Sequence, residues 1–319
     1  DIVMIYHADM YACPGLDVEV NRHIKKGVVV SGTRIEPPLH PDGPEKILMD
    51  YGIEPEEFKE QELLTWLNSS PEHTHSKLGK ETTEGIFAPW AIMKEDFQSI
   101  GGHDSLYAPQ SKEDSDIFNR FLLAGYKFVQ TWRGFVYHMT CRGSRFADGA
   151  KRNPNGEVFM KNRETDEWLQ QNHRSTRNFI RKWGHFVKHD EYLKPIVPPK
   201  YDIGLVVKNC NEQLLEALEP WCSTIYVDTF AEDYIDKEQP NTIFDLSKRI
   251  YSIDSEKQND IEIRFDGSEF NDNSYQYIQQ LSEILANDEL EIGSFKLDIF
   301  EIIINKIKTY EEKNIKCER

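Results

Sequence analysis

The chain has 319 residues, which is long enough to bury a sizeable core and predicts about two domains. Its content of 39% hydrophobic and 12% aromatic residues is that of a globular soluble protein. Because no apolar run approaches the length of a membrane span, we expect no integral membrane segment.

The formal charge of −17 is spread unevenly along the chain. Residues 201–319 hold 26 acidic and 12 basic side chains, whereas residues 1–200 hold 29 and 26. This step predicts a domain boundary near residue 200. It also argues against nucleic acid as a partner of the acidic part, since phosphate backbones attract basic surfaces. The five cysteines are scattered without a CxxC pair, which favours a reducing, cytoplasmic location over a disulfide framework.

Apolar runs and breakers predict alternating strands and helices in the first part of the chain. Residues 1–6 (DIVMIY) form a continuous apolar run, which is typical of a buried, parallel strand. A helix ending near Gly27 follows, then a strand that begins at residue 28 and enters a proline-rich loop at Glu36. Further helices are expected over residues 54–69, 95–100, 116–124 and 165–189, and further strands over residues 85–94, 126–131 and 134–139. Residues 143–165 are predicted to form a polar loop.

Residues 194–200 (KPIVPPK) are expected to form a semi-rigid linker, because they are rich in proline and the charge step falls there. Beyond this segment, strands predicted over residues 202–209, 223–228, 260–267 and 295–305 alternate with helices over residues 211–221 and 274–287. The segment 242–250 fits either element. The predicted organisation is therefore a domain of residues 1–193, a linker of residues 194–200, and a smaller acidic α/β domain of residues 201–319 without an assigned role.

A packed acidic run, Glu113-Asp114 followed by Asp116, is the first candidate for chemistry. Like charges this close repel and raise one another's pKa, and a carboxylate held that way can act as a general base near neutral pH. The alternative interpretation is structural. In it, Ser111 caps a helix and the acidic side chains favour the positive end of the helix dipole.

Two further candidates follow predicted strands. Asp9 comes directly after the first apolar run, and His138 ends the strand over residues 134–139. Ligands bind at strand ends in open α/β sheets, so the pair could hold Mn²⁺ or Mg²⁺ at a nucleotide diphosphate. Taken singly, each residue also has a structural interpretation, Asp9 as a turn cap and His138 as a hydrogen-bonded strand histidine.

The order of these motifs resembles that of a known enzyme family. The order is a strand ending in HAD (His7 to Asp9), a strand followed by GGHD (Gly101 to Asp104), ED-x-D-x-x-x-R (Glu113 to Arg120), AGY (Ala124 to Tyr126) and a strand ending at His138. It resembles the inverting glycosyltransferases of family 2, over roughly residues 1–190. The resemblance implies an α/β fold of the GT-A type, with a mixed sheet flanked by helices.

The resemblance also implies roles for individual residues. Asp9 would be the metal ligand, with His138 completing a Mn²⁺ or Mg²⁺ site, and Asp114 would be the catalytic base beside Glu113. The residues implied to bind donor or acceptor are His7, Trp90, Asp104, Asp116 and Arg120. The implied reaction is hexosyl transfer from a nucleotide-sugar donor, UDP-sugar foremost, to a hydroxyl on a glycan or another acceptor.

Two departures from the family pattern shape further expectations. His7 stands where family members carry an aspartate, so an imidazole would contact the nucleotide or the metal there. Family members also place roughly 60–90 residues of nucleotide-binding units ahead of this strand, so the chain is expected to be an N-terminally truncated enzyme. Both departures keep a second hypothesis open, a non-catalytic binding or assembly module. A metal-dependent hydrolase using the same carboxylates is a third hypothesis, weakened by the lack of a second set of metal ligands.

Overall fold

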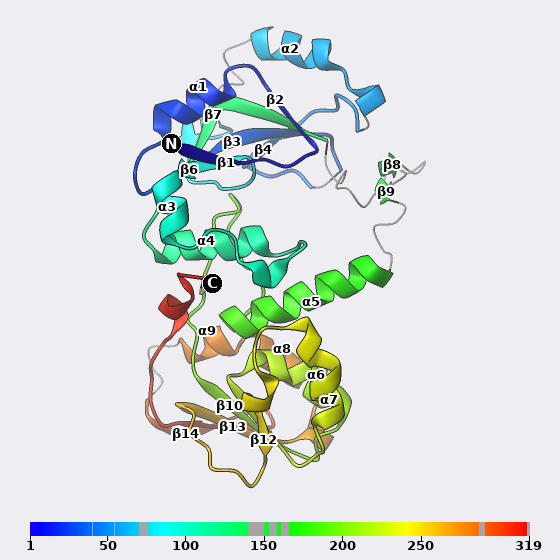
Figure 1. The fold of residues 1–319 in the computed structure, drawn as a ribbon, viewed down its shortest axis with the longest axis vertical. Helices are drawn as coiled ribbons and strands as arrows, with labels where there is room; N and C mark the ends of the chain where they lie inside the picture. The colour runs from blue at the N-terminus through cyan, green and yellow to red at the C-terminus, as the bar shows by residue number, and fades with distance from the viewer. Residues whose placement is uncertain are drawn as a thin grey trace.

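The computed structural model describes residues 1–39, 41–53, 55–69, 76–139, 150–152, 158–160, 166–286 and 291–317. It is a mixed α/β structure with two large sheets, one above the other in the view of Figure 1, and helices flanking both. The α/β class predicted from the sequence is therefore confirmed. Within the described ranges, no helix combines the length and the apolar character needed to cross a bilayer.

The first sheet is built around two long parallel strands. Its order is β1-β6-β3-β7-β2, with β4 beside β3 and β5 beside β7. The strands are β1 (Ile2–Ile5), β2 (Met10–Ala12), β3 (Val28–Glu36), β4 (Lys46–Leu48), β5 (Thr82–Thr83), β6 (Trp90–Met93) and β7 (Lys127–His138). The two strands predicted over residues 126–131 and 134–139 are one strand, β7, which pairs in parallel with β3 across a bulge at Gly32 and Thr33. This parallel pair fixes where the carboxyl ends of β3 and β7 lie.

The first strand forms as predicted, but the prediction that it is buried and parallel was wrong. β1 lies at the edge of the sheet and pairs antiparallel with β6. Ile2 and Met4 on one of its faces are 43% and 36% exposed. A continuous apolar run predicts a strand, but it does not report which neighbours cover the two faces.

Helices of the first part are α1 (Leu16–His23), α2 (Glu60–Ser69), α3 (Lys94–Ser99), α4 (Glu113–Leu123) and α5 (Asp166–Trp183). The predicted polar loop over residues 143–165 falls mostly outside the described residues. Inside them, β8 (Ala150–Arg152) and β9 (Val158–Met160) pair antiparallel, so part of that loop is a strand pair.

The second sheet has the order β12-β11-β10-β13-β15-β14. Its strands are β10 (Ile203–Lys208), β11 (Thr224–Val227), β12 (Ile250–Ser252), β13 (Ile261–Asp266), β14 (Gly293–Leu297) and β15 (Phe300–Ile304), and its helices are α6 (Glu212–Leu218), α7 (Glu232–Glu238), α8 (Asp272–Gln279) and α9 (Leu281–Leu285). The alternate residues Ile203, Leu205 and Val207 enter a core shared with all four helices. The single strand predicted over residues 295–305 is instead a hairpin, which turns at Asp298 with a φ of 52°.

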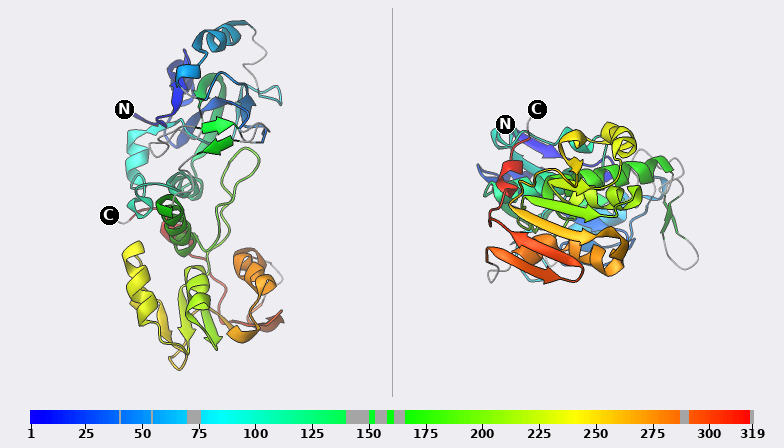
Figure 2. Two further views of the ribbon diagram at one scale, coloured as in Figure 1. Left: turned by 90° about the vertical axis from the view of Figure 1, so that its right-hand side faces the viewer. Right: turned by 90° about the horizontal axis from the view of Figure 1, so that it is seen from below.

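α5 lies between the two sheets, as Figures 1 and 2 show, and contacts both parts of the chain. Trp183 near its end packs with Leu106 and Tyr107 of the first part. On the other side, Arg181 donates to Glu219, with both side chains fully buried. The C-terminal segment returns to the first part, where the backbone N–H of Cys317 donates to the carbonyl of Ile100. The helix and this segment therefore hold the two sheets together.

Candidate metal site and acidic helix terminus

Three of the predicted site residues converge at one edge of the first sheet. The potential ligand atoms of His7, Asp9 and His138 all lie within 4.8 Å of one another. Strand pairing produces this arrangement: β2 runs antiparallel to β7, and Met10 at its start is the register partner of His138 at the end of β7. Asp9 immediately precedes Met10, and its carbonyl accepts from the backbone N–H of Met139.

His138 is held between two carboxylates. Its Nε2 lies 3.5 Å from Asp9 Oδ1, and its Nδ1 lies 2.8 Å from Glu36 Oε1. Burial by itself would lower the pKa of the imidazole, but the hydrogen bonds and charges of Asp9 and Glu36 outweigh it and raise this pKa above its ordinary value. A ring held at both nitrogens has a defined orientation, as a metal-ligating histidine requires.

Glu36 belongs to a buried group of four charges that sequence analysis did not single out. It accepts from Arg34 Nη1 at 2.8 Å and lies 3.2 Å from Lys46 Nζ, and Arg34 also donates to Glu45 at 3.2 Å. All four side chains are at most 10% exposed. Burial opposes ionisation of Glu36, but His138, Arg34 and Lys46 together lower its pKa to about 2. One sequence signal could have revealed this group. Arg34 and Glu36 lie two residues apart at the end of a long apolar strand, so they share one face of it.

The acidic run begins α4 and reaches the same site. Asp114 Oδ2 lies 3.4 Å from His7 Nε2, and its side chain is 23% exposed. Glu113 faces inward, and its buried Oε2 has no hydrogen-bond partner within the described structure. Burial, assisted by the neighbouring charge of Asp114, raises the pKa of Glu113. Asp114 is thus the carboxylate of this pair that contacts His7.

The predicted helix cap at Ser111 was wrong. α4 begins after Lys112, which has a left-handed backbone with a φ of 76° and makes no side-chain cap hydrogen bond. Ser111 itself has a φ of 80°. The three carboxylates nevertheless occupy the first turn of α4, where the helix dipole favours negative charge.

Three predicted substrate-binding residues are buried in the protein interior. Asp116 and Arg120 are fully buried and form an ion pair at 2.8 Å. The Nη1 and Nη2 atoms of Arg120 donate to the carbonyls of Ile100 and Gly102. Trp90 is also fully buried and packs against aromatic rings of the core. The structure thus places Asp116, Arg120 and Trp90 in the interior, which does not favour the substrate-binding role predicted for them.

Asp104 and Asp116 both form ion pairs with one lysine of α5. Lys182 Nζ lies 2.8 Å from Asp104 and 2.7 Å from Asp116, and Trp183 Nε1 donates to Asp116 at 2.9 Å. With Cys317, the two carboxylates have the spacing of a metal site. The ammonium group of Lys182 already supplies the cation there, so we interpret the cluster as a structural ion pair. Asp104 is consequently placed at the junction with α5 and apart from the group of His7, Asp9 and His138.

The donor set at His7, Asp9 and His138 selects among metals. It offers two imidazole nitrogens and one carboxylate oxygen, a set typical of transition ions such as Fe²⁺ and Zn²⁺ and less suited to Mg²⁺. Mg²⁺ prefers an all-oxygen set with several waters, so of the two predicted ions the residues fit Mn²⁺ better. The hydrogen bond from His138 to Glu36 completes the carboxylate–histidine arrangement common around such ions.

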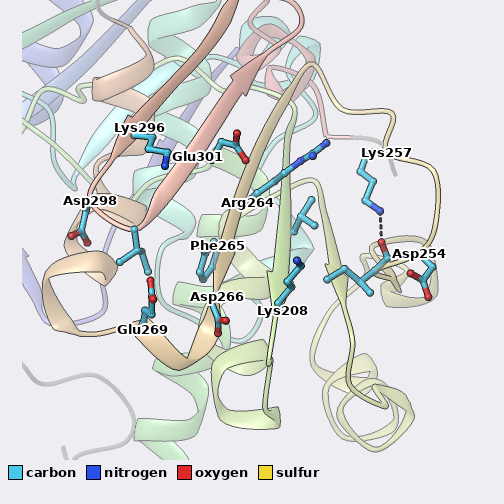
Figure 3. Close-up of a pocket in the computed structure, with 13 residues that line it drawn as sticks. Lys208, Asp254, Lys257, Arg264, Phe265, Asp266, Glu269, Lys296, Asp298 and Glu301 are labelled. Carbon is cyan, nitrogen blue, oxygen red and sulfur yellow. Dashed lines mark hydrogen bonds between the residues drawn. The ribbon is translucent and has the colours of Figure 1, made fainter.

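A cavity of about 810 Å³ opens on the second sheet, on the face away from the helices (Figure 3). Charged side chains of both signs line it. Arg264 of β13 and Lys296 of β14 are both register partners of Glu301 on β15, between them. Around Glu301 the charges alternate across neighbouring strands, and the lining as a whole holds four cationic and five anionic side chains, as on an ordinary solvated sheet face.

Comparison with known proteins assigns no family. No protein-family model matches the chain, and no curated protein matches it in sequence. The functional interpretation therefore depends on the geometry of the site and on the motif order in the sequence.

Proposed function

We propose that the chain is an inverting, divalent-metal-dependent glycosyltransferase, which moves a sugar from a nucleotide-diphosphate donor, UDP-sugar foremost, to a hydroxyl of a glycan or another acceptor. The observation that supports this most is the convergence of His7, Asp9 and His138 with Asp114 beside them. A carboxylate base next to a metal-type ligand set is the combination that such a transfer requires. Mn²⁺ bound there would supply positive charge to the departing diphosphate.

The proposed reaction assigns a separate role to each residue of the site. Asp9 and His138 would hold the ion, with His7 as a third ligand or as a contact to the nucleotide. Asp114 takes the proton of the acceptor hydroxyl as that oxygen bonds to the anomeric carbon of the donor. The bond from this carbon to the diphosphate oxygen breaks, and the nucleotide diphosphate leaves with the bonding electrons. One displacement on one face inverts the anomeric configuration.

Between the two adjacent carboxylates, the geometry favours Asp114 as the base. It is partly exposed and lies beside His7, whereas Glu113 is turned inward. Burial raises the pKa of Glu113 and encloses its Oε2, so an acceptor hydroxyl reaches the partly exposed Asp114 more readily. The predicted catalytic pair is thus proposed to act through Asp114.

The test combines metal binding with product analysis. Asp114→Asn is expected to abolish sugar transfer and to retain Mn²⁺ binding, whereas His138→Ala is expected to lose both. Asp233→Asn, which changes an exposed carboxylate on α7, is the control and should leave both unchanged. Transfer that persists in Asp114→Asn would refute the assigned base.

Two other outcomes identify the competing functions. Mn²⁺-dependent UDP binding without transfer to any hydroxyl acceptor would identify a binding module. Release of sugar to water as the sole product would identify a hydrolase. An α-configured product from an α-configured donor would exclude the single displacement.

A further inference from the structure

We propose that Glu36 is a positioning residue for the metal site, which fixes the tautomer and the ring orientation of His138 so that Nε2 is presented to the ion. This inference rests on the proposed function for the presence of the metal. It concerns a residue that no motif in the sequence marks.

The hydrogen bond itself defines the tautomer. Glu36 is the last residue of β3, only 2% exposed, and its Oε1 lies 2.8 Å from His138 Nδ1. An ionised carboxylate can only accept, so the hydrogen must be on Nδ1. With Nδ1 committed to Glu36, Nε2 is the nitrogen left for an ion, and it lies on the side of Asp9, whose Oδ1 is 3.5 Å away.

Cations hold Glu36 ionised and in place. Arg34 shares its strand face, two residues before it, and donates at 2.8 Å, while Lys46 on β4 lies at 3.2 Å. The guanidinium of Arg34 sits 4.0 Å from the centroid of the Phe87 ring. The same ring packs against His138 at a centroid distance of 6.2 Å, so the carboxylate, its cation and the imidazole are fixed as one unit.

Charge balance alone does not explain the contact with His138. Glu36 and Glu45 are two carboxylates facing two cations, Arg34 and Lys46. Among the described residues, Glu45 meets both cations and makes no hydrogen bond or ion pair with His138, and the four charges already sum to zero. The hydrogen bond that His138 Nδ1 donates to Glu36 is additional, and it connects this buried group to the proposed metal ligands.

Glu45 therefore provides the matched control. Glu36→Gln and Glu45→Gln each remove one buried negative charge from the same group, but only Glu36→Gln disturbs the bond to His138. The full chain is stripped of metal, and Mn²⁺ affinity is measured from the electron paramagnetic resonance of the free ion, with thermal melting recorded separately. We expect roughly 10–100-fold weaker binding for Glu36→Gln and a change within about threefold for Glu45→Gln.

Equal losses of affinity in the two variants, or none in either, would overturn the proposal. If Glu36→Gln does not fold, nitrogen-15 NMR of the wild-type imidazole above about pH 9 gives the tautomer directly. A hydrogen on Nδ1 of His138 is expected, and a hydrogen on Nε2 would overturn the assignment. A wild-type chain that binds no Mn²⁺ refutes both proposals, whereas selective loss of affinity in Glu36→Gln without any sugar transfer refutes the transfer alone.

Discussion

Replacing Asp116 with asparagine is expected to destabilise the chain by about 3 kcal/mol, at the lower end of the range for breaking a buried ion pair. The side chain is fully buried and faces Arg120 at 2.8 Å and Lys182 at 2.7 Å. Asparagine keeps the volume and one accepting oxygen, but it removes the negative charge that both cations share. The loss of that charge leaves a buried cation without full compensation.

The partners that remain set the magnitude. Lys182 keeps Asp104 at 2.8 Å, and Arg120 keeps two backbone carbonyls at 2.9 and 2.7 Å. These contacts limit the penalty, because neither cation becomes wholly unpaired. Without them, the same substitution would approach about 5 kcal/mol.

The assay is urea unfolding followed by the fluorescence of the six tryptophans, of which Trp183 donates through its indole to Asp116. Asp114→Asn is the control: it makes the same charge change two residues away, at a side chain that is 23% exposed. We expect it to change stability by less than about 1 kcal/mol, because the pair of Asp114 and His7 is partly exposed. Equal destabilisation by the two substitutions, or a loss below about 1 kcal/mol for Asp116→Asn, would refute the assignment of Asp116 to the interior.

Three further predictions concern pH, backbone strain and metal. Burial opposes ionisation of Glu219, but Arg249 and Arg181 lower its pKa to about 2. The ionised carboxylate therefore contributes roughly 3 kcal/mol to the free energy of unfolding above about pH 5, and this contribution is lost as the pH falls towards 2. The urea midpoint of the wild type should fall across this range, and the part of that fall due to Glu219 should be absent in Glu219→Gln. Gly52→Ala is expected to lower the melting temperature, because the φ there is +103° and an added Cβ would lie 2.4 Å from the carbonyl oxygen of Glu57; an unchanged melting curve would contradict this. Mn²⁺ at about 100 times its Kd should stabilise the chain by about 2.7 kcal/mol, chelation should remove that gain, and a melting temperature insensitive to both would count against a metal site.

The sequence predicted which residues of the candidate site lie together, but it did not predict which strand pairing brings them together. Asp9 and His138 were expected together because both follow apolar strands, and the structure brings them together. The contact is made through β2, a short strand that the apolar pattern did not reveal, whose pairing with β7 sets Met10 opposite His138. Three residues are too few to show a period, so only the sheet could disclose this register.

The sequence could not separate polar residues that face the site from those that are buried. Asp114 and Asp116 lie two residues apart in the same acidic run, yet one is partly exposed beside His7 and the other is fully buried. The difference depends on Lys182 and Trp183 of α5, more than sixty residues later in the chain. Local propensity carries no information about such a partner.

By itself, the sequence determined the α/β class, the positions of the long apolar strands and the uneven distribution of charge, because apolar periodicity and composition are local properties of the chain. Only the tertiary structure decided that β1 is an exposed edge, that Trp90 and Arg120 lie in the interior, and that Glu36 supports His138. Each of these depends on which distant segments pack together. That choice is made by strand pairing and the burial of whole surfaces, which no short stretch of sequence encodes.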